Sequence, residues 1–274
     1  MRLRDLNVQR LKHALSSAGL PEPLRVVGQG GYAMHTLTQR FDGDQDIDVA
    51  VVFRARDLGG LDALRLRSCV HDAVLSAAPD SFARPPERRT NAVTVWYSGG
   101  WHIDFALYRD TNGVLEHAGS RWVGSDPGAT VRWFQACNRE LSPSWRGHQS
   151  VPDNQLRRVV RMLKYLRHLD DGDHPGGFIV VALGVKYYQE SALGDDVALY
   201  QTMTAIVRGL GRSLDVANPL VRGQSLTWRV VDQRRLDNYR LKLEDMLRDL
   251  RPLAGRRNVQ DPVSYWEDAL EFSL

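Results

Sequence analysis

The sequence has few cysteines, no long apolar run and little net charge, and each shortage excludes a class of protein. Cys69 and Cys137 are the only cysteines and lack a CxxC or Cys/His ligand spacing, which excludes a disulfide framework and a structural zinc site. We expect two buried thiols. No stretch approaches the run of about 18 apolar residues that spans a bilayer. The charged, amphipathic start does not look like a signal peptide, so we expect a cytoplasmic protein without membrane contact.

The charge balance gives no clear indication of a nucleic-acid partner. The formal net charge is only +3, although 36 Lys and Arg residues leave room for a local basic patch. The other bulk values are those of an ordinary globular protein, with 43% hydrophobic and 25% charged residues. A length of 274 residues fits one large domain or two lobes, and we favour two.

The pattern of apolar residues changes near residue 150. Before it, strand, turn and helix signals alternate. We expect first a helix over 5–18, a short strand, a glycine turn, a helix from near Tyr32 and a strand at DIDVAVVF. A helix over 63–78, two strands over 91–97 and 101–108 joined at Ser98-Gly99-Gly100, and a further helix beyond Pro127 should follow. From Pro152 onward the pattern is helical, in the segments 154–169, 176–191, 196–214 and 236–250. We expect a mixed lobe over 1–150 and a helical lobe over 151–274. Trp266, Leu270 and Phe272 make the C-terminal tail apolar enough to dock.

Three aspartates occupy suggestive places on the expected strands. Residues two apart on a strand share a face, so Asp46 and Asp48 project together. If 101–108 continues the same sheet, Asp104 shares a face with His102 and Ala106 and joins them. Carboxylates held this close repel one another unless a cation neutralises them, and Mg²⁺ is the natural candidate because it takes hard oxygen ligands. The alternative reading is an acidic turn at DQDID and an isolated polar Asp104.

The glycine pair Gly30-Gly31 favours the metal site over that alternative. It stands between an expected strand and an expected helix start, where backbone amides and the helix dipole favour phosphate. A histidine on a strand is more often a satisfied structural residue, so His102 stays outside the predicted catalytic set.

The order QGGYAMHT, DID and HIDFALY resembles the signature of the DNA polymerase β-like nucleotidyltransferase superfamily. More closely, it resembles the bacterial CD-NTases, relatives of animal cyclic GMP-AMP synthase (cGAS/DncV-like enzymes). Ser125-Asp126-Pro127 before a helix containing Trp133, and LRRVVRMLK over 156–164, also match that family. The resemblance covers residues 25–170 well and the rest only by its helical character.

The resemblance implies an α+β nucleotidyltransferase core with a mixed sheet, a C-terminal helical lobe and an active site in the cleft between them. It implies Asp46, Asp48 and Asp104 as catalytic metal ligands for Mg²⁺, with Mn²⁺ as a possible substitute. It also places Gln29, Gly30, Gly31 and Lys164 at the nucleotide. Gly31 stands where most relatives have a serine hydroxyl for a phosphate oxygen, and His35 replaces a common glycine.

The implied activity is that of a cyclic oligonucleotide synthase, which joins nucleoside triphosphates such as ATP with release of pyrophosphate and makes second messengers for anti-phage defence (CBASS). A regulatory protein partner is possible, and activation by nucleic acid is not evident. Two alternatives stay open. One is an AbiEii or antitoxin-like enzyme that transfers a nucleotide to tRNA or protein, and the other is a non-catalytic nucleotide-binding relative.

Overall fold

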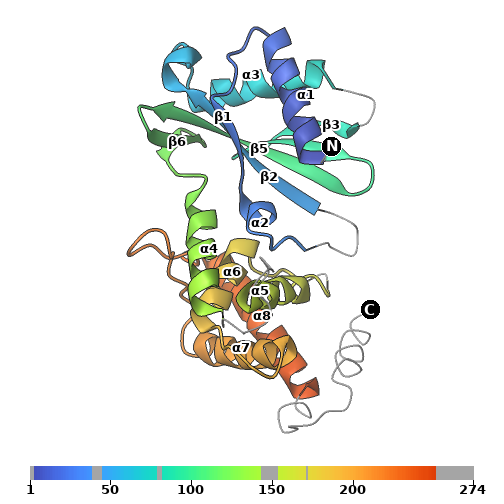
Figure 1. Cartoon of the computed structure of the whole chain (residues 1–274), viewed down its shortest axis with the longest axis vertical. Helices are drawn as coiled ribbons and strands as arrows, with labels where there is room; N and C mark the ends of the chain where they lie inside the picture. The colour runs from blue at the N-terminus through green and yellow to red at the C-terminus, as the bar shows by residue number, and fades with distance from the viewer. Residues whose placement is uncertain (1–2, 39–44, 79–81, 143–153, 171, 251–274) are drawn as a thin grey trace. The chain divides into compact units, whose positions relative to one another are not determined.

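The computed structural model describes residues 3–38, 45–78, 82–142, 154–170 and 172–250 (Figure 1). The chain divides into two compact units, Met1–Arg132 and Trp133–Leu274. The functional division at residue 150 and the cleft between two lobes stay predictions. The expected docking of Trp266, Leu270 and Phe272 lies outside the described residues.

The first unit is built on a seven-stranded mixed sheet in the order β1-β2-β5-β4-β3, with β6 on β5 and β7 on β6. Its strands are β1 Arg25–Gly28, β2 Gln45–Arg54, β3 Phe82–Arg88, β4 Val93–Tyr97, β5 Trp101–Thr111, β6 Val114–Ala118 and β7 Trp122–Gly124. β2 and β5 run parallel, whereas the other pairs are antiparallel. The predicted strands at DIDVAVVF, 91–97 and 101–108 are thereby confirmed as parts of one sheet.

β2 is a central strand, as its apolar run predicts. Val49, Val51 and Phe53 enter the main hydrophobic cluster of the unit, whereas Ala50 and Val52 enter a smaller cluster on the other face. All five are fully buried. Such a run is typical of a strand that is buried on both faces of the sheet.

One face of the sheet is covered by two helices, α1 Leu3–Ser17 and α3 Ala63–Ser76 (Figure 1). Leu11 and Leu15 of α1 and Leu66 and Val70 of α3 pack into the main cluster with β2, β4 and β5. Both helices match their predicted positions. A 3₁₀ turn, η1 Ala55–Leu58, links β2 toward α3.

Three strands were not predicted from the sequence, namely β3, β6 and β7. β3 reads FARPPER, and its two prolines argue against a strand because they cannot donate to a ladder. It nevertheless forms at the edge of the sheet, with register shifts around the prolines, which is where a proline is tolerated.

The described part of the second unit is helical. Its helices are α5 Gln155–Leu166, α6 Gly177–Tyr187, α7 Asp195–Leu210 and α8 Val230–Asp249, and α4 Ala129–Leu141 runs across the boundary between the units. All four predicted segments are confirmed, although α8 begins ahead of the expected start at Leu236. Tyr239 of α8 is fully buried and donates its hydroxyl to the Leu163 carbonyl at 2.8 Å, which ties α8 to α5.

The architecture is therefore α+β, as the sequence predicts. Cys69 and Cys137 are free thiols, but both are half-buried rather than fully buried, because neither belongs to the buried clusters. Among the helices of the described residues, none is both long and apolar enough to cross a membrane.

Candidate active site

Four polar side chains share one face of the sheet where β2 and β5 run parallel. In the pairing register Asp46 lies opposite His102, and Asp48 lies opposite Asp104. Ile47, Ile103 and Phe105 alternate with them and point into the main cluster on the other face. The predicted convergence of the aspartates on one face follows from this parallel register.

Asp104 is held by a neighbour on β4. Thr94 is its register partner, is fully buried, and donates its hydroxyl to Oδ1 of Asp104. This hydrogen bond fixes the direction of the carboxylate.

His102 lies beside Asp46. The imidazole Nε2 lies 3.4 Å from Oδ1 of Asp46. The His102 side chain is 8% exposed, whereas that of Asp46 is 48% exposed, so a buried ring lies beside an accessible carboxylate. His102 was not among the site residues predicted from the sequence. Its place in the sequence could have indicated this role, because a residue two positions before Asp104 on a strand has its side chain on the same face.

The donor set fits a divalent cation. Asp46, His102 and Asp104 each offer one ligand atom, and these atoms lie within 4.8 Å of one another. Carboxylate oxygens suit Mg²⁺, and an added imidazole nitrogen is also compatible with Mn²⁺. Asp48 is not one of these three: its carboxylate lies beside the glycine turn, and its part in the metal site stays a prediction.

The glycine turn contacts the strand that carries the aspartates. Gln29 donates its amide N–H to the Asp48 carbonyl at 3.0 Å, and Gly30 has a positive φ of 61°. Here the structure corrects one expectation: the helix that follows, α2 Gly30–Ala33, is a single turn that begins at Gly30 rather than a longer helix from near Tyr32. A single helical turn has only a small dipole. For phosphate binding, the backbone N–H groups of this turn therefore matter more than the dipole.

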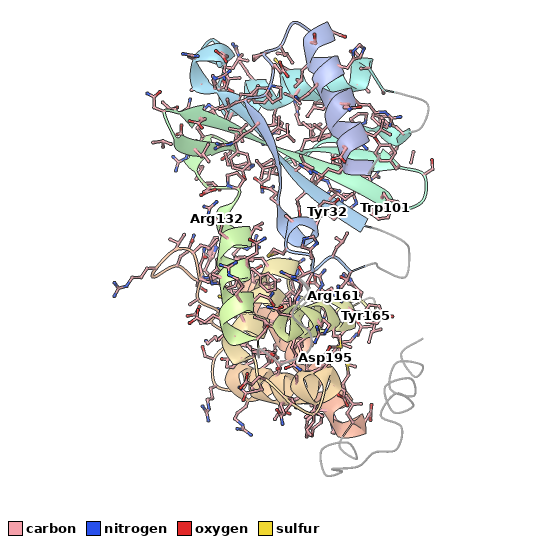
Figure 2. The ribbon with its side chains drawn as sticks, in the orientation of Figure 1. Tyr32, Trp101, Arg132, Arg161, Tyr165 and Asp195 are labelled. Carbon is pink, nitrogen blue, oxygen red and sulfur yellow. The ribbon has the colours of Figure 1, made fainter. Side chains whose placement is uncertain are left out.

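α2 lies at the end of the sheet where the central strands β2 and β5 begin. Figure 2 shows Tyr32 of α2 and Trp101, the first residue of β5, at the same end of the sheet. Gln45 and Trp101 are register partners there. The glycine turn and the aspartates therefore meet at one edge of the first unit.

Tyr108 adds a contact that was not predicted from the sequence. It lies on the same face of β5 as Asp104, and its hydroxyl reaches Oε1 of Gln29 at 3.4 Å. Burial raises the pKa of Tyr108, a hydrogen bond with Ser125 opposes that rise, and the nearby charge of Asp48 adds to it. The sequence could have indicated this contact, because Tyr108 and Asp104 are an even number of residues apart on one strand and so share a face. The tyrosine connects the Ser125-Asp126-Pro127 motif with the glycine turn.

Lys164 lies on α5 in the second unit. Leu156, Val159, Val160, Leu163 and Leu166 form the buried face of this helix, as predicted. Arg161 and Tyr165, one turn apart on α5, are labelled in Figure 2. Lys164 is 7% exposed, and its Cε and Nζ lie beside Gly177 at the start of α6. The contact of Lys164 with the nucleotide stays a prediction.

A mixed sheet with three aspartates on adjacent parallel strands and a glycine turn beside them defines a polymerase β-like nucleotidyltransferase core. Residues 24–108 match the family model described as "Cyclic GMP-AMP synthase DncV-like, nucleotidyltransferase domain". This match makes that part of the chain similar to the DncV-like nucleotidyltransferase domain, in agreement with the CD-NTase resemblance drawn from the sequence. All three aspartates and the glycine turn lie inside the matched residues.

Solved structures share the fold over most of the chain. The Bradyrhizobium diazoefficiens CD-NTase CdnG, solved in complex with GTP, aligns with a TM-score of 0.70 at 17% identity, covering 98% of this chain and 90% of that one. The Vibrio cholerae cyclic AMP-GMP synthase DncV aligns with a TM-score of 0.66 at 17% identity, covering 90% and 68%. DncV with non-hydrolysable GTP gives a TM-score of 0.66 at 16% identity, covering 91% and 68%.

Proposed function

We propose that this protein is a cyclic oligonucleotide synthase that joins nucleoside triphosphates and releases pyrophosphate. The observation that carries the proposal is the parallel register that pairs Asp48 with Asp104 and Asp46 with His102, inside a segment that matches the DncV-like nucleotidyltransferase family. The fold relatives CdnG and DncV were solved with GTP or its non-hydrolysable form, which supports a nucleoside triphosphate as substrate.

Each group of site residues has a chemical role in this proposal. The amides of Gly30 and Gly31, with Gln29 beside them, bind phosphate oxygens of the triphosphate, and Lys164 adds a positive charge. Asp46, Asp48 and Asp104 hold divalent cations, with Mg²⁺ as the expected metal. When bound, such ions lower the pKa of an attacking hydroxyl and neutralise the departing pyrophosphate.

The reaction proceeds by in-line attack of an acceptor hydroxyl on the α-phosphorus. One phosphorus–oxygen bond forms, the bond to pyrophosphate breaks, and the hydroxyl proton passes to solvent or to the carboxylate of Asp104. A second attack by a hydroxyl of the linear product closes the ring. Thr94 keeps Asp104 oriented through both steps by donating to Oδ1.

The test is incubation of the purified chain with all four labelled triphosphates and Mg²⁺, without an acceptor. We expect phosphatase-resistant products whose masses, measured by mass spectrometry, give their nucleotides and ring size. The Asp46→Asn, Asp48→Asn double variant should lose turnover while keeping its fold. Asp72→Asn is the matched control, because Asp72 is an exposed aspartate on α3 away from the site. Retained turnover in the double variant contradicts the metal assignment.

The first alternative changes only the acceptor. An AbiEii or antitoxin-like enzyme transfers a nucleotide to tRNA or protein, and the pair Gly30-Gly31 favours it because those enzymes also carry two glycines in the turn. The same assay decides: product only after addition of RNA or protein supports that reading. Nucleotide binding without turnover under any condition supports a non-catalytic relative.

The role in anti-phage defence belongs to the same proposal. We expect expression of the chain with its natural neighbours in a bacterial host to lower phage plaque counts, and the Asp46→Asn, Asp48→Asn variant to restore them. Dependence of the purified enzyme on an added protein from that host would identify the regulatory partner.

A further inference from the structure

We infer that His102 is a positioning residue, which holds the Asp46 carboxylate in the direction required of a metal ligand. This inference rests on the proposed function, since it concerns the same site. It assigns a role to a buried histidine that the predicted catalytic set does not contain.

The first support is a row of side chains that crosses four strands. Asp46 on β2 pairs with His102 on β5, His102 pairs with Trp96 on β4, and Trp96 pairs with Arg84 on β3. A parallel row holds Asp48, Asp104 and Thr94. In both rows a carboxylate has a polar neighbour on the next strand, and in the second row that neighbour, Thr94, donates to the carboxylate of Asp104. In the first row the polar neighbour of Asp46 on the next strand is His102.

The second support is the way the imidazole is fixed. The rings of Trp96 and His102 stack with their centroids 4.5 Å apart at an interplanar angle of 31°. The guanidinium carbon of Arg84 lies 3.7 Å from the centroid of Trp96, so the indole is itself held by a cation–π contact. A buried ring in such a stack has little freedom to turn its nitrogen away from Asp46.

The third support is the contrast between the two partners. Asp46 is half exposed, and an exposed carboxylate samples several rotamers at little cost. Nε2 of His102 lies 3.4 Å from Oδ1 of Asp46, and this electrostatic contact favours the rotamer that leaves the other oxygen for the cation. Partners of this kind behind metal ligands are worth about 10- to 100-fold in metal affinity. His102 therefore acts through Asp46 and needs no contact with the substrate.

The experiment uses two variants that separate the ring from the donor. His102→Phe keeps an aromatic ring against Trp96 but removes the N–H donor. His102→Gln removes the ring but keeps an amide donor at a similar reach from the backbone. Mn²⁺ alone is titrated into the full-length chain, and its dissociation constant is measured by water-proton relaxation. His13→Gln, at an exposed position on α1, is the control for loss of any histidine.

We expect His102→Phe to weaken Mn²⁺ binding about 10- to 100-fold, and His102→Gln and His13→Gln to stay close to the wild type. Circular dichroism and the unfolding midpoint establish that each variant is folded. Equal Mn²⁺ affinity in all variants overturns the inference. Weaker Mn²⁺ binding by His102→Gln with unchanged binding by His102→Phe also overturns it, because the aromatic contact with Trp96 and not the N–H donor would then support the site.

A spectroscopic measurement separates positioning from direct ligation. Electron spin-echo modulation of bound Mn²⁺ reports nitrogen ligands directly. The wild type should show no directly bonded nitrogen, and a coupling that vanishes in His102→Phe makes the imidazole a ligand and overturns the positioning role. If the wild type binds no Mn²⁺ and makes no product, the proposed function fails with it. If it binds Mn²⁺ and only the variants disagree, the inference about His102 fails alone.

Discussion

The carboxylate of Asp48 fills the space beside Gly30 that any larger residue would need. An ideal Cβ at position 30 would lie 2.6 Å from Cγ of Asp48, and Gly30 has a φ of 61°, which L side chains rarely adopt. The glycine turn and the aspartate are thus fitted to each other, and the close approach depends on the absence of a side chain.

Replacement of Gly30 by alanine should displace Asp48. We expect Gly30→Ala to lower turnover about 100-fold, because a shift of about 1 Å in a reacting group has an effect of that size. Gly19→Ala is the matched control: Gly19 has a similar φ of 67° but no atom within 4 Å of its ideal Cβ. It should lose comparable stability and keep its turnover. Steady-state kinetics and urea unfolding of both variants test the pair, and equal loss of turnover contradicts the displacement.

The hydroxyl of Thr94 is expected to matter for catalysis through Asp104. Thr94→Val keeps the shape of a fully buried side chain but removes the donor to Oδ1 of Asp104. Its kcat should fall at least about 10-fold, because a ligand loses the hydrogen bond that orients it. Thr94→Ser retains the hydroxyl and should recover most of the rate. Wild-type kinetics in the valine variant would show that Asp104 needs no such support.

We expect His35 to lower the stability of the first unit. It is an exposed residue at a φ of 56°, in the left-handed region where a side chain is unfavourable by about 1–2 kcal/mol. After the greater chain entropy of glycine is subtracted, His35→Gly should raise the free energy of unfolding by about 0.5–1 kcal/mol. His13→Gly, within α1, should lower it by a similar amount. Denaturant unfolding measures both, and a loss at position 35 would mean that the imidazole makes a stabilising contact.

Asp170 should make the second unit sensitive to acid. Burial alone would raise its pKa, but hydrogen bonds from Lys242, from His174 at 2.6 Å and from the Gly172 amide lower it to about 2. A carboxyl group with a lowered folded-state pKa stabilises the fold above its ordinary value of 3.8. That contribution is lost as the pH falls from 3.8 toward about 2.

The test compares the wild type with Asp170→Asn across that pH range. The asparagine variant should be less stable at pH 7, and the difference should shrink as the pH approaches 2. Added salt should also reduce it, because the side chain of Asp170 is 48% exposed. A difference that does not depend on pH would assign the effect to packing rather than to charge.

The sequence predicted most of the elements and named the candidate site residues. Period and composition placed the long helices, and the apolar run after Asp46 and Asp48 predicted the central strand that β2 is. These features are local, because spacing along a strand fixes which side chains share a face. The same rule put Asp104 and His102 together before any strand was paired.

Only the tertiary structure decided which strands are neighbours and in what register. The parallel pairing of β2 with β5 aligns Asp48 with Asp104 and Asp46 with His102, and a shift of one residue would have sent each pair to opposite faces. The strand at FARPPER forms only because the edge of an existing sheet accepts its prolines. Sequence spacing cannot give such facts, because they depend on contacts between segments far apart in the chain.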